Sequence, residues 1–170
     1  MIVAFDASML IYLFDQNASS PEDKNTGKPV NHCKLRVEYL ILTLQHDQAK
    51  IVIPTPSLAE VLVRAQAGAP ERLKILKESK HFRIVSFDER AAIEFAATQA
   101  TRILSGSKPA LGLRTKAKFD DQIISIATVE GAVKIYSDDE HIFKAAASRF
   151  EVIGIADLPL PVENQQPKLL

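Results

Sequence analysis

The sequence contains a single cysteine, Cys33, so it can form no internal disulfide and cannot supply the several thiolates of a zinc–thiolate site. Neither sign of charge is in excess, because Lys and Arg together number 21 and Asp and Glu together also number 21. Nucleic-acid-binding domains usually carry a basic excess, so any phosphate-binding surface here must be local. No apolar run approaches the roughly 18 residues of a membrane span, and the first residues lack the basic region and cleavage pattern of a signal peptide. These absences predict a cytoplasmic protein without a membrane partner.

Short apolar stretches alternate with helical patterns along the 170 residues, a length suited to one domain. Strands are predicted at residues 2–5, 50–53, 82–87, 133–136 and 152–155. Helices are predicted at residues 8–15, 31–46, 57–68, 70–80, 88–104, 120–130 and 141–150, with long loops at residues 17–29 and 106–117. This alternation predicts an α/β fold in which a parallel β-sheet is flanked by helices on both faces. We expect the domain to occupy residues 1–156 and a surface tail to occupy residues 157–170.

Acidic residues near strand ends are the candidate functional residues, since ligands of open α/β sheets bind beyond the carboxyl ends of the strands. Asp6 directly follows the first predicted strand. It could begin the next helix, but Ser8 is available as the N-cap, so the role of Asp6 stays open. Glu60 lies in the first turn of its helix, away from the apolar face. An ion pair with Arg64, four residues further on, would also account for Glu60.

Two adjacent pairs of aspartates complete the set. In the helix predicted from residue 120, Asp120 projects onto the centre of the apolar face and Asp121 towards its edge, so Asp120 is the candidate site residue. An N-cap role would also suit Asp120. Asp138 and Asp139 follow the strand at residues 133–136, where a capping box beginning at Ser137 would favour acids in the first turn. A capping box does not explain two aspartates at the strand end, so both remain candidates.

Several carboxylates at one sheet edge repel one another, and a divalent cation relieves that repulsion. Mg²⁺ favours oxygen ligands and retains waters, and a bound water is a nucleophile for phosphodiester hydrolysis. Other chemistries have less support. The four histidines have no ligand spacing, no G-x-S-x-G or P-loop motif occurs, and Asp6-Ala-Ser8 lacks the second aspartate of a haloacid-dehalogenase-like phosphatase. The pattern therefore predicts metal-dependent phosphodiester hydrolysis.

Four segments in this order resemble the PIN-domain family, and within it the VapC-type ribonuclease toxins of prokaryotic toxin–antitoxin pairs. The segments are IVAFDAS, PTPSLAEVL, FDDQIISIA and KIYSDDEHI, which together span residues 2–143. The resemblance implies a three-layer α/β/α fold and Mg²⁺- or Mn²⁺-dependent endoribonuclease activity on single-stranded RNA. It also implies a homodimer and a cognate antitoxin partner.

The resemblance also assigns roles to residues. The family's catalytic and metal-binding acids correspond to Asp6, Glu60, Asp120 and one of Asp138 or Asp139. Spacing through Gly131 favours Asp138 as the fourth acid, whereas the hydroxyl-x-Asp pattern that begins at Ser137 favours Asp139. Ser8 and Ser137 match the hydroxyl residues that line the family's site.

Four basic residues precede the third acid and would supply a local phosphate-binding patch, or simply a solvated loop: Lys108, Arg114, Lys116 and Lys118. The two loops and the tail are longer than in compact toxins of the family. Three alternatives therefore stay open. The chain could be an RNA-processing nuclease outside a toxin–antitoxin pair, or a PIN fold that binds RNA or protein without turnover. It could also be a phosphatase-like domain that uses Asp6 with Asp138.

Overall fold

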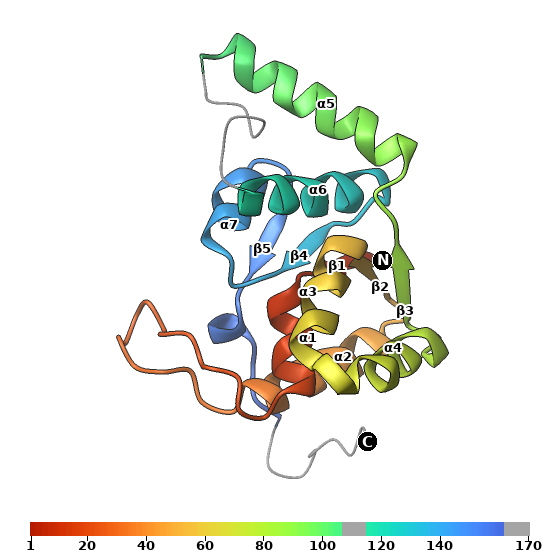
Figure 1. Cartoon of the computed structure of the whole chain (residues 1–170). Coiled ribbons are helices and arrows are strands. Elements are labelled where there is room, and N and C mark those ends of the chain that lie inside the picture. The colour runs from red at the N-terminus through yellow and green to blue at the C-terminus, as the bar shows by residue number, and fades with distance from the viewer. Residues whose placement is uncertain (107–114, 162–170) are drawn as a thin grey trace.

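A five-stranded sheet lies at the centre of the computed structural model, which describes residues 1–106 and 115–161 (Figure 1). Its strands are β1 (Ile2–Phe5), β2 (Lys50–Pro54), β3 (Phe82–Val85), β4 (Lys134–Tyr136) and β5 (Glu151–Ile153). They lie in the order β3-β2-β1-β4-β5, and every neighbouring pair is parallel. The predicted α/β fold with a parallel sheet is confirmed.

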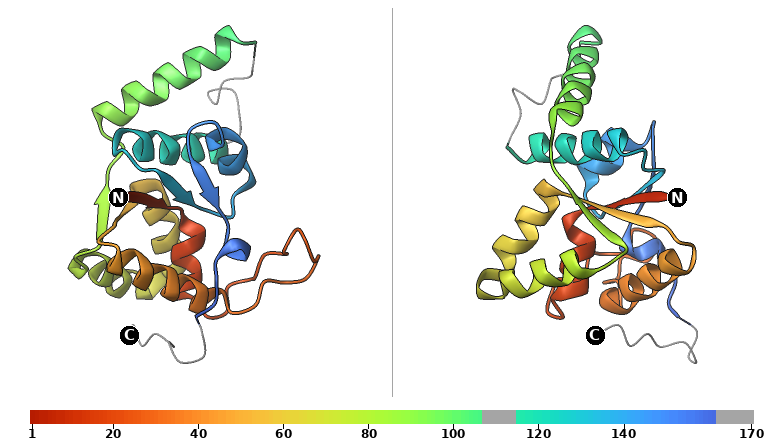
Figure 2. Two further views of the ribbon diagram at one scale, coloured as in Figure 1. Left: turned by 180° about the vertical axis from the view of Figure 1, so that it is seen from behind. Right: turned by 90° about the vertical axis from the view of Figure 1, so that its right-hand side faces the viewer.

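Helices cover both faces of this sheet (Figures 1 and 2). They are α1 (Ala7–Phe14), α2 (Cys33–His46), α3 (Thr55–Ala65), α4 (Ala69–Glu78), α5 (Glu89–Leu104), α6 (Thr115–Val129) and α7 (Glu140–Ala146). Side chains alternate between the two faces along a strand. Val3 and Phe5 accordingly pack in the cluster formed with α1 and α2, whereas Ala4 packs in the cluster formed with α6 and α7. The two clusters define three layers, with the sheet in the middle.

The start of α3 differs from the sequence prediction. The helix begins at Thr55, with Pro54 as the N-cap, and not after a cap at Ser57. Pro56 fits the first helical turn, because a proline there loses no intrahelical hydrogen bond and its φ is already helical. Ser57 is therefore an internal helix residue, 1% exposed, and its hydroxyl is available to the site described below.

The start of α6 also differs from the prediction. The helix begins at Thr115 and not at residue 120, so Asp120 is not its N-cap. Lys116 and Lys118 consequently lie on the first turns of a helix and not in a loop. Pro109 and Gly112 are the helix-breaking residues that precede this start in the sequence, so the local sequence permits a helix from Thr115.

The segment at residues 17–29 forms the expected loop and projects from the body of the molecule (Figure 1). A bridge between Glu22 and Pro29 closes it, and Gly27 provides the positive φ that its turn requires. Leu158, within the predicted tail, is 4% exposed, and its carbonyl accepts a hydrogen bond from Arg36, while the surface course of residues 157–170 stays a prediction. Within the described residues, no helix is both long and apolar enough to cross a bilayer.

Candidate active site

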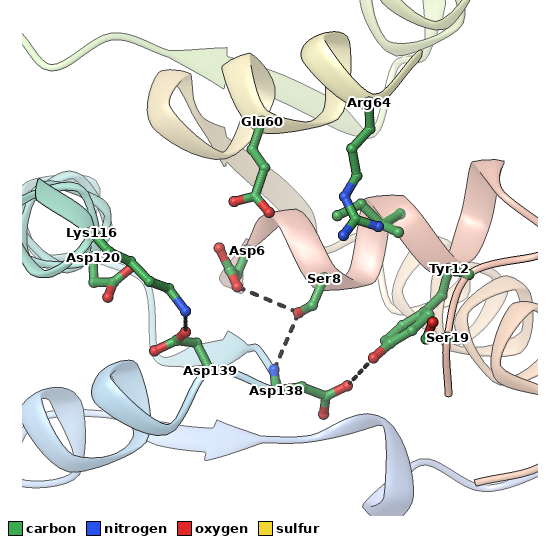
Figure 3. Close-up of a pocket in the computed structure, with 12 residues that line it drawn as sticks. Asp6, Ser8, Tyr12, Ser19, Glu60, Arg64, Lys116, Asp120, Asp138 and Asp139 are labelled. Carbon is green, nitrogen blue, oxygen red and sulfur yellow. Dashed lines mark hydrogen bonds and ion pairs between the residues drawn. The ribbon is translucent and has the colours of Figure 1, made fainter. Parts of the chain in front are cut away.

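A pocket of about 230 Å³ opens beyond the carboxyl ends of β1 and β4 (Figure 3). The order of the strands reverses between these two strands, and ligands of open α/β sheets bind at such a switch point. Five acids and two basic residues line the pocket: Asp6, Glu60, Asp120, Asp138, Asp139, Arg64 and Lys116. The five acids chosen from the sequence thus lie around one pocket, although they come from four separate segments of the chain.

Asp6 follows β1 and is the N-cap residue of α1, although its side chain makes no capping hydrogen bond. Its backbone N–H donates to the Tyr136 carbonyl of β4 at 3.0 Å, which places it beside the neighbouring strand end. Its carboxylate accepts from Ser137 at 2.9 Å and from Ser57 at 3.4 Å. Burial raises the pKa of Asp6, and the hydrogen bonds from the Ala7 N–H and from Ser137 only partly oppose this shift.

Two serines connect Asp6 to the segment after β4. The Ser137 hydroxyl donates to Asp6 and accepts from the Asp139 N–H at 3.0 Å. The Ser8 hydroxyl donates to the same Asp6 oxygen at 3.4 Å and accepts from the Asp138 N–H at 3.1 Å. The two hydroxyls therefore hold the Asp6 carboxylate in a fixed orientation, as hydrogen bonds to metal-binding carboxylates commonly do.

Asp120 and Asp121 project from α6 in different directions. Asp121 accepts two hydrogen bonds from Arg102 of α5, at 2.5 and 2.8 Å, and one from Gln99 at 3.1 Å. Asp120 faces the pocket, is 6% exposed, and has an Oδ2 atom without a hydrogen-bond partner among the described residues. Burial, together with the negative charge of Asp139, raises the pKa of Asp120 to about 7. Asp120 is thus a buried acid with one uncompensated oxygen.

Glu60 extends from α3 towards Asp6, and its negative charge contributes to the raised pKa of Asp6 (Figure 3). No ion pair joins Glu60 to Arg64 within the part of the chain that the structure describes, so the structural alternative for Glu60 does not hold there. Arg64 extends instead along the far side of the pocket, towards Ser8 and Tyr12 (Figure 3).

Asp139 is the N-cap of α7, where its Oδ1 accepts from the N–H groups of His141 and Ile142 at 2.8 and 3.2 Å. The cap is therefore Asp139 itself and not the predicted capping box from Ser137. Its Oδ2 lies 2.5 Å from Lys116 Nζ. Burial disfavours the charged carboxyl, but the Lys116 ion pair and the hydrogen bonds from the Ile142 and His141 N–H groups together outweigh it and lower the pKa of Asp139. The same ion pair raises the pKa of Lys116.

Asp138 is directed away from the other acids (Figure 3). Its Oδ2 accepts from the Tyr12 hydroxyl at 2.8 Å, and its Oδ1 accepts from the Ile155 N–H at 2.8 Å. A Cβ at Gly154 would come within 2.9 Å of Asp138 Oδ1, so a larger residue there would displace this carboxylate. Burial raises the pKa of Asp138, against the effect of those two hydrogen bonds. The geometry therefore favours Asp139 over Asp138 as the fourth member of the acidic cluster, which we define as Asp6, Glu60, Asp120 and Asp139.

Three further residues at the site were not predicted as site residues: Tyr12 and Arg64 line the pocket, and Ser57 donates a hydrogen bond to Asp6. Ser57 precedes Glu60 by three residues, and Arg64 follows it by four, so all three share one face of α3. Tyr12 follows Ser8 by four residues and shares its face of α1 in the same way. A position one helical turn away from a candidate site residue, either Glu60 or Ser8, is therefore the signal that would have found them.

The acidic cluster offers ligand types that suit a divalent cation. Its carboxylates are oxygen donors, which Mg²⁺ and Mn²⁺ favour, and Asp120, whose buried Oδ2 has no hydrogen-bond partner among the described residues, lines the pocket. Among the residues described, no three acids, histidines or cysteines already lie close enough together to hold an ion. Binding would therefore draw the carboxylates of the acidic cluster together.

The predicted phosphate-binding patch is only partly described. Lys108 and Arg114 lie outside the described residues. Lys116 lines the pocket, whereas Lys118 lies on α6 outside the pocket lining. Of the two described members of the patch, Lys116 is thus the one that contacts the acidic cluster.

No protein-family model matches the chain, and no curated protein matches it in sequence. Solved structures do match it. VapBC2 from Rickettsia felis, bound to a DNA fragment from its promoter, is 14% identical with a TM-score of 0.58, over 91% of this chain and 98% of that chain. FitAcB from Neisseria gonorrhoeae is 18% identical with a TM-score of 0.57, over 93% and 100% of the two chains. VapC20 from Mycobacterium tuberculosis, described as a sarcin-ricin loop cleaving toxin, is 12% identical with a TM-score of 0.52, over 92% and 99%.

At these identities the likeness shows the fold alone. The chain has the three-layer α/β/α fold of a PIN domain. Its structural neighbours are the VapC-type toxin structures, which cover nearly its whole described length. The resemblance seen in the order of the sequence motifs is therefore confirmed at the level of the fold.

Proposed function

We propose that this chain is a metal-dependent endoribonuclease that hydrolyses phosphodiester bonds in single-stranded RNA. One observation carries the proposal: four acids from distant segments line one pocket, and a buried oxygen of one of them, Oδ2 of Asp120, has no hydrogen-bond partner in the described structure. Buried carboxylates without partners are costly unless a cation compensates them. A structural role for the acidic cluster would leave this oxygen unexplained.

Asp6, Glu60, Asp120 and Asp139 would hold a Mg²⁺ or Mn²⁺ ion. When bound, the ion supplies Lewis acidity to a phosphoryl oxygen and makes its water more acidic. The chain's own groups then have separate tasks. Ser137 and Ser8 orient the Asp6 carboxylate, and Arg64 lies across the pocket, where its guanidinium can bind a phosphate of the RNA strand.

The comparisons support a biological setting of the same kind. The neighbours include the structures of VapBC2 and FitAcB, and VapC20 is named as a sarcin-ricin loop cleaving toxin. We extend this to the present chain as a proposal: it is the toxin of a toxin–antitoxin pair, it binds a cognate antitoxin, and it forms a homodimer. Light scattering of the purified chain measures the dimer, for which the expected mass is twice 18.8 kDa.

Cleavage of labelled single-stranded RNA by the purified chain tests the activity. We expect internal cuts with Mg²⁺ or Mn²⁺ and none with excess EDTA, and activity should return when metal is added back. Tight RNA binding without cleavage in either metal would instead establish a PIN fold that binds without turnover. Transfer of phosphate onto Asp6 would establish the phosphatase-like alternative.

A further inference from the structure

Lys116 lies beside the acidic cluster, where its positive charge offsets the negative charges of the carboxylates. Its Nζ is 2.5 Å from Asp139 Oδ2, and its charge also acts on Asp120 and Glu60 (Figure 3). It precedes Asp120 by four residues on α6, so one face of one helix carries both an acid of the cluster and a cation that neutralises it. Its side chain is 73% exposed, whereas that of Asp139 is 14% exposed.

The two oxygens of Asp139 are not equivalent. Oδ1 accepts two backbone N–H groups as the cap of α7, and this commitment leaves Oδ2 for any further ligand. Oδ2 is the atom that Lys116 contacts. A Mg²⁺ ion would bind a carboxylate oxygen at about 2 Å, and an ammonium group on the same oxygen would then lie within strong repulsion of the ion. The ammonium and the metal therefore compete for one oxygen atom.

We propose that Lys116 is a built-in counter-ion of the acidic cluster, which a divalent metal displaces when it binds. This inference rests on the proposed metal-dependent function and adds a residue to it. In the metal-free chain, Lys116 limits repulsion among the carboxylates. In the metal-bound chain, its ammonium group is released on a flexible stem at the edge of the pocket, where it binds a phosphate of the substrate strand. Metal binding and RNA binding are thereby coupled, and the coupling is reciprocal.

The first test measures Mn²⁺ affinity by calorimetry without RNA. Lys116→Met is compared with Lys118→Met, which removes the same charge from a position on α6 outside the pocket lining. An exposed or half-exposed ion pair is worth up to about 1 kcal/mol, or about fivefold in affinity. We therefore expect Lys116→Met to bind Mn²⁺ about fivefold more tightly than wild type, and Lys118→Met to differ from wild type by less than about twofold.

The second test compares melting temperatures with and without metal. In EDTA, Lys116→Met should melt below wild type, because the carboxylates lose their counter-ion. At saturating Mn²⁺ the two proteins should melt together, because Lys116 no longer contacts Asp139 in either. A difference of equal size in both conditions would show that the ion pair persists beside the metal and would overturn the inference.

The outcomes separate this inference from the proposed function. If wild type binds Mn²⁺ but Lys116→Met and Lys118→Met have equal affinities, the counter-ion role is wrong and the metal site stands. If wild type binds neither Mn²⁺ nor Mg²⁺, both proposals fall. In an Asp139→Asn background, Lys116→Met should change the affinity for Mn²⁺ less than it does in the wild-type background, because the shared oxygen has lost its charge.

Discussion

The hydroxyl of Tyr12 lies 2.8 Å from Oδ2 of Asp138, although 126 positions separate the two residues in the chain. With the Ile155 N–H on its other oxygen, Asp138 joins α1 to the segment after β5. Asp139 keeps an oxygen in the pocket beside Lys116. Asp138 and Asp139 are adjacent in the sequence but have different surroundings in the fold. Substitution of each residue in turn should therefore affect RNA cleavage differently.

Asp139→Asn should lower the rate of RNA cleavage at saturating metal by about a hundredfold or more, because a charged oxygen of the acidic cluster is lost. Asp138→Asn should retain cleavage within about tenfold of wild type. Initial rates of cleavage at matched protein concentration measure both effects. The reverse order of the two losses would assign the fourth acid to Asp138.

Tyr12→Phe should lower the free energy of unfolding by about 1–3 kcal/mol, because it removes the donor to a buried carboxylate. Urea denaturation measures this loss. Tyr39→Phe, at a partly exposed position on α2, is the matched control and should change stability by less than about 0.5 kcal/mol. Equal losses of unfolding free energy in the two variants would show that the Tyr12–Asp138 hydrogen bond does not stabilise the fold.

Ser137→Ala should weaken metal binding or slow cleavage by about 10- to 100-fold, because the Asp6 carboxylate loses the hydrogen bond that orients it. Ser125→Ala is a suitable control, since Ser125 is also buried but its hydroxyl donates to the backbone of α6, away from the pocket. Calorimetry with Mn²⁺ and the cleavage assay measure the two effects. If Ser137→Ala binds Mn²⁺ and cleaves RNA as wild type does, Ser137 does not orient the Asp6 carboxylate for metal binding.

The metal-free chain should lose stability as the pH rises from about 4 to about 8. The pKa of Asp120 is about 7 in the folded chain and 3.8 as its ordinary value, so the folded state retains a proton that the unfolded state has lost between these values. The stabilisation is complete below the lower value and is lost as the pH passes the higher one. Urea denaturation in EDTA at a series of pH values measures it, and Asp120→Asn should flatten the dependence. An equal slope in wild type and Asp120→Asn would contradict the raised pKa.

Much of the fold follows from patterns that act over a few residues. The apolar stretch at residues 2–5 is typical of a strand buried on both faces, and such patterns predict all five strands of the sheet to within a few residues. Helix starts were less certain, because Pro54 and Pro56 permit an earlier start of α3 than a serine cap suggests. The position of Leu158 depends on Arg36, which is distant in sequence, so a local pattern cannot predict it.

Only part of the site could be predicted from the sequence, because local patterns do not show which distant residues come into contact. The helix projection separates Asp120 from Asp121, because the direction of a side chain on a helix is a local property. The choice between Asp138 and Asp139 depends on Tyr12, Ile155 and Lys116, which no local pattern connects to them. Only the tertiary contacts of Asp138 and Asp139 distinguish the two residues.

RNA cleavage by Asp120→Asn at saturating Mn²⁺ tests the central claim most directly. The substitution keeps the shape of the side chain and removes the charge, so the fold should be retained, as measured by circular dichroism and melting temperature. We predict that cleavage falls by about a hundredfold or more, and that Asp47→Asn, which changes an exposed acid after α2, cleaves as wild type does. Undiminished metal-dependent cleavage by a folded Asp120→Asn protein would contradict the account.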